Sequence, residues 1–132
     1  NNIILFVALG VVLFLIILNE IKRFTRGFRE INPTETVQLI NHENALLLDV
    51  RESNELASGT IAGSRHLAMS VLKQRVDELK EFIERPIVVV CKTGARSIQA
   101  CEILRKANFV NVACLKGGIE AWRNASLPIK KK

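Results

Sequence analysis

The chain has 132 residues, of which 48% are hydrophobic, and 19 lysines and arginines against 13 aspartates and glutamates give it a net charge of +6. This length allows one domain of ordinary size plus an appendage, and the apolar content is sufficient for a packed core. The mild positive charge comes without a basic stripe interleaved with aromatic residues, which argues against nucleic acid as a partner. The three cysteines Cys91, Cys101 and Cys114 form no C-x-x-C pair and fit a reducing compartment better than a disulfide framework.

The N-terminal segment is apolar without interruption from Ile3 to Leu18. As a helix, this run spans about 24 Å of the roughly 30 Å hydrocarbon layer of a bilayer, and extension through Ile21 closes the gap. A helix that is apolar on all sides favours a membrane span over a buried helix of a soluble core. A cleaved signal peptide is the main alternative, but no basic residue precedes the run and no small-x-small site follows it. We therefore expect residues 1–24 to form an uncleaved transmembrane anchor.

Four cations follow the apolar run, and nothing charged precedes it except a terminal amine. The positive-inside rule then predicts a single-pass protein with its N-terminus outside and its domain in the cytoplasm. Apolar residues recur at helical spacing opposite these cations, so the basic juxtamembrane linker, residues 25–33, is expected to continue as an interfacial helix on anionic lipid. A solvated linker is the alternative. The cations are Lys22, Arg23, Arg26 and Arg29, and the apolar residues are Ile21, Phe24, Phe28 and Ile31.

Helices and strands are expected to alternate over residues 34–128. Helices are predicted at 34–41, 71–83, 97–106 and 119–124, and buried strands at 45–50, 87–90 and 110–115. This alternation predicts an α/β domain with a mostly parallel central sheet flanked by helices, and ligands at the carboxyl ends of the strands. Residues 129–132 are expected to form a basic, solvated tail.

Cys91 lies between a buried apolar run and the start of a predicted helix. Gly94 allows the following loop to curl so that consecutive amides point inward, and Lys92 and Arg96 add fixed positive charge. Unpaired N–H groups at a helix N-terminus favour a bound anion and a thiolate. A lone cysteine after a strand is otherwise a small buried hydrophobic residue, but such a cysteine needs none of these neighbours. We therefore expect Cys91 to be reactive or to bind an anion.

Other polar residues have weaker claims to a role. Asp49 lies at the end of the first predicted strand, where its carboxylate could orient Arg96 or Arg51, and a structural ion pair fits the pattern equally well. Cys101 falls on a predicted helix and Cys114 in a predicted strand, so both are interpreted as core residues. A resolving role is the alternative for Cys101.

Four segments in a fixed order carry a family resemblance. They are LLDVRE at 47–52, GTIAGSRHL at 59–67, CKTGARS at 91–97 and LKGGIEAW at 115–122. Their order and spacing resemble the single-domain rhodanese (sulfurtransferase) family, over about residues 34–128. With the anchor in front, the chain is similar to a membrane-tethered bacterial rhodanese-like protein of the inner membrane. Thr60 stands where the family often has histidine, which puts nothing catalytic in doubt.

The resemblance implies that Cys91 accepts a sulfane sulfur from a small donor such as thiosulfate and passes it to a thiol or cyanide-like acceptor. The persulfide would be held by backbone N–H groups of the substrate-binding loop, with Asp49 and Arg51 in support and without a general base. No metal or organic cofactor is called for, and His42 and His66 are interpreted as structural or solvated. The loop residues are Lys92, Thr93, Gly94, Ala95, Arg96 and Ser97.

Two other functions compete with this interpretation. Related folds bind a tetrahedral oxyanion in a cysteine loop, as in phosphatases and arsenate reductases. Here four residues separate Cys91 from Arg96, one fewer than in the C-x₅-R loop of tyrosine phosphatases, and Val90 stands where those enzymes place a histidine. The second alternative is a non-enzymatic binding module that docks to an integral membrane protein.

Overall fold

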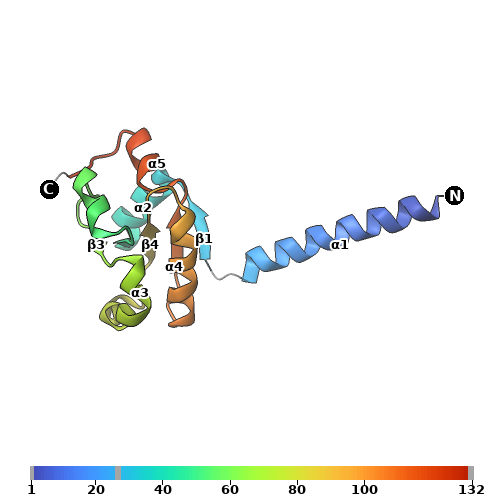
Figure 1. The fold of residues 1–132 in the computed structure, drawn as a ribbon, viewed down its shortest axis with the longest axis horizontal. Helices are drawn as coiled ribbons and strands as arrows, with labels where there is room; N and C mark the ends of the chain where they lie inside the picture. The colour runs from blue at the N-terminus through green and yellow to red at the C-terminus, as the bar shows by residue number, and fades with distance from the viewer. Residues whose placement is uncertain (1, 26–27, 131–132) are drawn as a thin grey trace.

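A computed structural model describes residues 2–25 and 28–130 and shows a long N-terminal helix followed by a compact α/β domain (Figure 1). Helix α1 spans Ile3–Thr25. Its segment Ile3–Ile21 is 19 residues long, apolar enough to cross a membrane and nowhere buried inside the structure. A signal sequence would have the same length and composition. The predicted N-terminal apolar helix is therefore present. Arg26 lies outside the described residues, as do the side chains of Lys22, Arg23 and Phe24.

The domain is built on a five-stranded sheet in the order β1-β5-β4-β2-β3, and every pair of neighbouring strands is parallel. The predicted α/β fold with a central parallel sheet is confirmed. The strands are β1 (Phe28–Ile31), β2 (Leu46–Asp49), β3 (Arg65–His66), β4 (Ile87–Val90) and β5 (Val112–Leu115), and the helices are α2 (Pro33–Glu43), η1 (Ser53–Ser58), α3 (Met69–Arg75), η2 (Val76–Phe82), α4 (Ala95–Lys106) and α5 (Gly118–Asn124).

Helices cover both faces of the sheet, and two separate cores result. Leu48 and Val89 pack on one side with residues of α3, η2 and α4. Leu47 and Val88 point to the other side, where they pack with residues of α2 and α5. The central strands β2, β4 and β5 are buried on both faces, which explains why their residues are apolar. The exception is Asp49, the last residue of β2, which is hydrogen-bonded inside the protein.

The interfacial helix expected over the juxtamembrane linker, residues 25–33, is wrong for residues 28–31. Phe28–Ile31 forms strand β1 at the edge of the sheet, with Phe28 opposite Val112 and Ile31 opposite Leu115. Pairing with β5 satisfies the backbone and buries Ile31 completely, and these gains outweigh the local apolar spacing that had suggested a helix. Asn32 then caps α2, since its Oδ1 accepts a 2.8 Å hydrogen bond from the Glu35 N–H.

Two further segments differ from expectation. The predicted helix over 71–83 is divided into α3 and the 3₁₀ helix η2. Residues 129–130, expected to open a solvated tail, are instead attached to the domain. The backbone of Lys130 pairs with Thr60 in an antiparallel bridge, with N···O distances of 2.8 and 2.6 Å. Trp122 Nε1 also donates to the carbonyl of Pro128 at 2.9 Å, which fixes the start of this segment.

Candidate active site

Cys91 follows β4 directly and is only 1% exposed. The backbone N–H of Gly94 donates a 2.8 Å hydrogen bond to Cys91 Sγ, and the Ser97 hydroxyl lies 3.7 Å from the same sulfur. Ser97 is fully buried, and its hydroxyl donates to the Gly94 carbonyl at 2.8 Å. The loop therefore brings one backbone N–H and one hydroxyl toward the sulfur. A backbone donor aimed at a sulfur atom stabilises negative charge on that atom.

Two glycine positions allow this loop to close. Gly94 has a φ of +100° at the start of α4, and a Cβ there would lie 3.2 Å from the Gly117 nitrogen. Gly118, with a φ of +61°, passes even closer, because a Cβ on it would lie 2.3 Å from the Cys91 carbonyl oxygen. The Ile119 N–H donates to that oxygen at 2.8 Å. The segment that opens α5 thus packs backbone to backbone against the cysteine loop and supports it.

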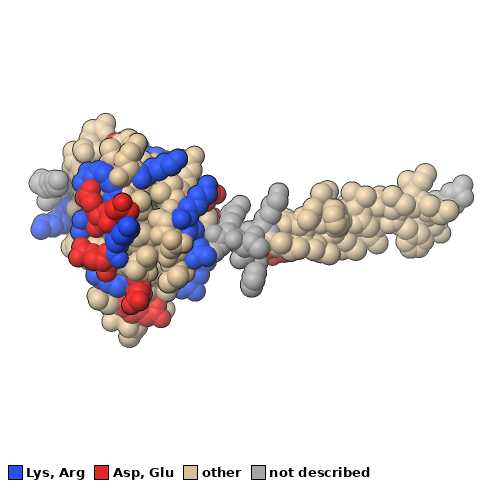
Figure 2. Space-filling model, turned by 90° about the horizontal axis from the view of Figure 1, so that it is seen from below, with Lys and Arg blue, Asp and Glu red and all other residues tan. Residues whose placement is uncertain are grey.

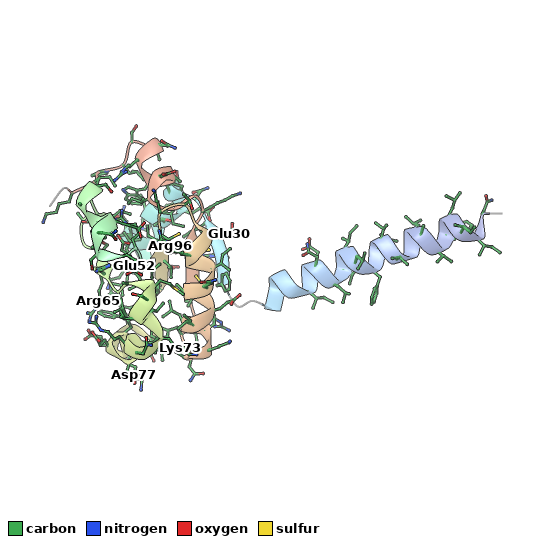
Figure 3. The ribbon with its side chains drawn as sticks, in the orientation of Figure 1. Glu30, Glu52, Arg65, Lys73, Asp77 and Arg96 are labelled. Carbon is green, nitrogen blue, oxygen red and sulfur yellow. The ribbon has the colours of Figure 1, made fainter. Side chains whose placement is uncertain are left out.

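Arg96 points from the first turn of α4 toward η1, where it pairs with Glu55 (Figure 3 labels Arg96 and Glu52). Arg96 Nη1 lies 2.5 Å from Glu55 Oε1, and Arg96 Nη2 lies 2.6 Å from Glu55 Oε2. The Glu52 N–H donates a further hydrogen bond of 3.0 Å to Glu55 Oε1. The hydrogen bonds from Arg96 hold the pKa of Glu55 at about 2, and the pair raises the pKa of Arg96. The positive charge of Arg96 is thus matched within the domain.

Asp49 and Arg51 form the structural ion pair that the sequence left as one alternative. Arg51 Nη2 lies 2.7 Å from Asp49 Oδ2, and the two side chains are almost completely buried. Arg51 Nη2 also donates to the Gly59 carbonyl at 2.8 Å. Asp49 therefore makes its contact with Arg51 rather than with Arg96. Arg51 Nη1 also lies 3.4 Å from the Glu55 carbonyl, so the pair connects the end of β2 to η1 and to the residue that follows it.

Glu55 is the site residue that the sequence analysis missed. Its partner Arg96 is 41 residues away in the chain, and no local pattern connects them. The only sequence signal was the spacing of Glu52 and Glu55, which predicts a capping box at the start of a helical turn and is found there. That spacing predicts where η1 begins but does not show which cation pairs with Glu55.

The remaining candidates take different places. Lys92 and Thr93 are exposed residues of the cysteine loop, and Ala95 is the first residue of α4. Cys101 and Cys114 are buried in the core with Cys91, and the hydrogen bond to Cys114, together with burial, raises the pKa of the Cys101 thiol.

The two histidines lie outside the cysteine loop. His66 Nε2 donates to the Arg51 carbonyl at 2.6 Å, which is a structural contact, and His42 is exposed near the end of α2. Within residues 2–25 and 28–130, no group of three or more histidines, cysteines or carboxylates could hold a metal ion.

A family model for the rhodanese-like domain matches residues 32–125. The chain, with its parallel sheet and its cysteine loop after β4, belongs to the rhodanese family.

Relatives extend this assignment. The chain is 34% identical over 126 residues to the uncharacterized protein YibN of Escherichia coli (strain K12), a match that covers 95% of this chain and 83% of that protein. It is 31% identical over 103 residues to thiosulfate sulfurtransferase GlpE of Actinobacillus pleuropneumoniae, which covers 78% and 94% of the two chains. A rhodanese-related protein from Thermoplasma volcanium has a similar crystal structure, with a TM-score of 0.71 and 31% identity over 79% of this chain and 99% of that one. Together these similarities support a sulfurtransferase kind of enzyme.

Proposed function

We propose that the protein is a membrane-anchored sulfurtransferase that carries sulfane sulfur as a persulfide on Cys91. The observation that carries this proposal is the 2.8 Å hydrogen bond from the Gly94 N–H to Cys91 Sγ, inside a loop whose amides open α4. Such an arrangement holds the negative charge of a persulfide, without a general base.

The proposed reaction has two balanced steps. The Cys91 thiolate attacks the outer sulfur of thiosulfate, the S–S bond of the donor breaks, and sulfite leaves with the electron pair. The outer sulfur, now bonded to Cys91, carries the negative charge. An acceptor thiolate or cyanide then attacks that sulfur, forms a new bond to it, and releases Cys91 as the thiolate. Each step exchanges one bond to sulfur for another and needs no outside oxidant or reductant.

The ion pair of Arg96 assigns different roles to the two cations of the loop. Because Glu55 neutralises Arg96, attraction of the anionic donor falls to the exposed Lys92 and to the backbone amides. Arg96 instead fixes the first turn of α4 against η1 and thereby holds the loop in its closed form. We propose that Arg96 and Glu55 are positioning residues, whereas Cys91 is the catalytic residue.

The proposed location is the bacterial inner membrane. Support comes from the apolar segment Ile3–Ile21 and from the cations Lys22, Arg23, Arg26 and Arg29 that follow it in the sequence. The positive-inside rule then predicts a cytoplasmic domain. Because the three cysteines of the domain are buried, the test uses the exposed variant Glu120→Cys. A thiol reagent that does not cross membranes should label this variant in lysed cells but not in intact cells. Labelling in intact cells would reverse the proposed orientation, and loss of the segment from the mature protein would identify it as a signal sequence.

The sulfur chemistry is tested directly on the purified full chain. Incubation with thiosulfate should add the mass of one sulfur atom to the peptide that contains Cys91, and cyanide should then release that sulfur as thiocyanate. The matched variants are Cys91→Ser, which should lose both signals, and Cys101→Ser, which should keep them because Cys101 is buried in the core. Equal behaviour of wild type and Cys91→Ser would show that the protein is not a sulfurtransferase, and would favour a binding module that docks to a membrane protein.

A further inference from the structure

The chain enters the sheet at the end opposite Cys91. Phe28, the first residue of β1, is in register with Val112, and Val112 is in register with Ile87, the first residue of β4. All strands are parallel, so Cys91, which follows β4, lies at the other edge. A strand of four residues is about 13 Å long. The apolar helix therefore joins the domain at the amino edge of the sheet, whereas the candidate active site lies at the carboxyl edge.

The amino edge carries a group of cations and one exposed apolar side chain, which we call the basic edge. Val110 is 68% exposed and is the one large hydrophobic residue among the described residues of the domain that is so open to solvent. It lies just before β5, next to the last turn of α4. The basic edge consists of Arg29 in β1, Arg85 before β4, Arg105 and Lys106 at the end of α4, and Val110.

Figure 2 views the domain from below. In Figure 3, Asp77 and Lys73 are near this lower end, and Arg96 lies farther from it. Lysine and arginine side chains gather on the side of this end where the chain arrives from α1. Carboxylates collect mainly on the opposite side. The amino edge also carries Glu43, the last residue of α2, and Glu84, which follows η2. The part of this edge that lies away from β1 therefore has mixed charge.

Internal structure accounts for part of this arrangement. Cations in the last turn of a helix interact favourably with its dipole, and Arg105 Nη1 donates to the carbonyls of Phe109 and Val110 at 2.9 and 3.2 Å. Arg85 Nε donates to the Asn44 carbonyl at 2.9 Å. These contacts explain neither the exposure of Val110 nor the position of the cations beside the start of β1.

We infer that the basic edge docks on the anionic phospholipid headgroups of the bilayer that holds α1, with Cys91 on the side away from the membrane. This inference rests on the proposed membrane anchoring. Only residues 26 and 27 separate α1 from β1, so a membrane-spanning α1 keeps this edge close to the headgroups at a high effective concentration. Cations are attracted to an anionic leaflet, and an exposed valine beside them can enter its interface.

The orientation has a consequence for the substrates. A domain docked in this way presents the cysteine loop to water, so the sulfur donor and acceptor reach Cys91 from the aqueous phase. They are therefore small water-soluble anions or thiols, or thiols of soluble proteins, rather than lipid-soluble carriers within the bilayer.

The test uses the full chain with Cys91→Ser, reconstituted into phosphatidylcholine vesicles with or without phosphatidylglycerol. An environment-sensitive fluorophore is attached to Val110→Cys or, as the matched control, to Thr93→Cys at the opposite edge. Cys101 and Cys114 are buried and should stay unlabelled. We expect brominated lipid to quench the label at position 110 strongly, but only in vesicles that contain phosphatidylglycerol. The label at position 93 should remain unquenched in both.

High ionic strength and charge reversal test whether electrostatic attraction to the lipid causes the quenching. Quenching at position 110 should be lost at high ionic strength and in the exposed double variant Arg29→Glu, Lys106→Glu. A label at position 110 that stays in water, or one at position 93 that is quenched as strongly, overturns the docking. Flotation of the vesicles distinguishes a failure of the docking from a failure of the membrane anchor. A chain that floats with an aqueous label at 110 is anchored but not docked, whereas a chain that does not float overturns the anchor and the docking together.

Discussion

Arg96 and Glu55 join two segments that are 41 residues apart through a two-pronged ion pair, with nitrogen-to-oxygen distances of 2.5 and 2.6 Å. The pair connects the first turn of α4, which follows the cysteine loop, to η1. A guanidinium group matches a carboxylate in this geometry, and an ammonium group does not. The shape of the cysteine loop therefore depends on a residue outside the loop.

Replacement of Arg96 by lysine should slow sulfur transfer although the charge is kept. Loss of one charged hydrogen bond costs roughly 1.5 kcal/mol, so we expect kcat/KM for thiosulfate to fall about tenfold. The matched control is Arg75→Lys, because Arg75 at the end of α3 makes a similar, exposed two-pronged pair with Glu78 of η2. If Arg75→Lys reduces the rate as much as Arg96→Lys, the ion pair has no special role at the site.

The stability conferred by Glu55 should depend on pH in a defined direction. Arg96 lowers the pKa of Glu55 to about 2 in the folded chain, so the carboxylate stabilises the fold above the ordinary glutamate pKa. This contribution is lost as the pH falls toward 2. Both side chains are partly exposed, so we expect wild type to be more stable than Glu55→Gln by about 1 kcal/mol at pH 7.

Urea denaturation of both proteins at several pH values measures this difference, which should shrink steadily below about pH 4.3, the ordinary glutamate pKa. Glu120→Gln is a suitable control, because Glu120 is exposed on α5. A difference between wild type and Glu55→Gln that stays constant down to pH 2.5 would contradict the assigned pair.

Gly118→Ala should damage the site more than a glycine replacement with the same backbone strain elsewhere. The Cβ would lie 2.3 Å from the Cys91 carbonyl oxygen, so the cysteine loop must move. Gly63 has a φ of +80° with nothing within 4 Å of its Cβ position, and Gly63→Ala therefore measures the cost of the left-handed conformation alone.

For Gly63→Ala we expect a loss of about 1 kcal/mol in unfolding free energy and unchanged sulfur transfer. For Gly118→Ala we expect a larger loss of stability and a strong loss of the thiocyanate signal. Thermal denaturation and the cyanide assay check the two variants. Full activity of Gly118→Ala would show that the packing of α5 against the loop is not required.

Asp49→Asn should be strongly destabilising because it leaves the buried Arg51 without its counter-charge. Removal of one partner of a buried pair typically costs about 3–5 kcal/mol. The control is Asp77→Asn, whose partner Lys80 is 3.4 Å away on the surface and whose loss should cost less than about 1 kcal/mol. Chemical denaturation measures both. Similar losses in the two variants would show that burial of Asp49 has no energetic weight.

The sequence predicts the site best where its parts are contiguous. Cys91, the glycine of its loop and the helix start lie within a few residues, so local rules were sufficient for the strand, the loop and the helix. Glu55 escaped prediction because its role depends on how η1 packs beside α4, which is a long-range contact. The alternatives for Asp49 could not be separated for the same reason, since the choice between Arg51 and Arg96 is made by the fold.

Strand β1 could not be predicted from the local sequence either, because its pairing is also a long-range contact. Its four residues, Phe28–Ile31, are too few to display the alternation of a strand, and their apolar spacing also fits a helix. The partner strand begins at Val112, 84 positions along the chain from Phe28, so only the closed sheet reveals the pairing. The bridge between Thr60 and Lys130 was hidden in the same way, because a short lysine-rich end is polar in sequence whether or not its backbone is paired.

The contact between Gly118 and the Cys91 carbonyl has a consequence for the newly made protein. The cysteine loop is held by the pairing of Arg96 with η1 and by the start of α5, so its support is complete only after the last helix has docked. Before that step the cysteine loop lacks the backbone contacts from Gly118 and Ile119 that hold it in place. Sulfur loading should therefore report completed folding, and during synthesis this cysteine is vulnerable to oxidation until α5 has emerged and docked.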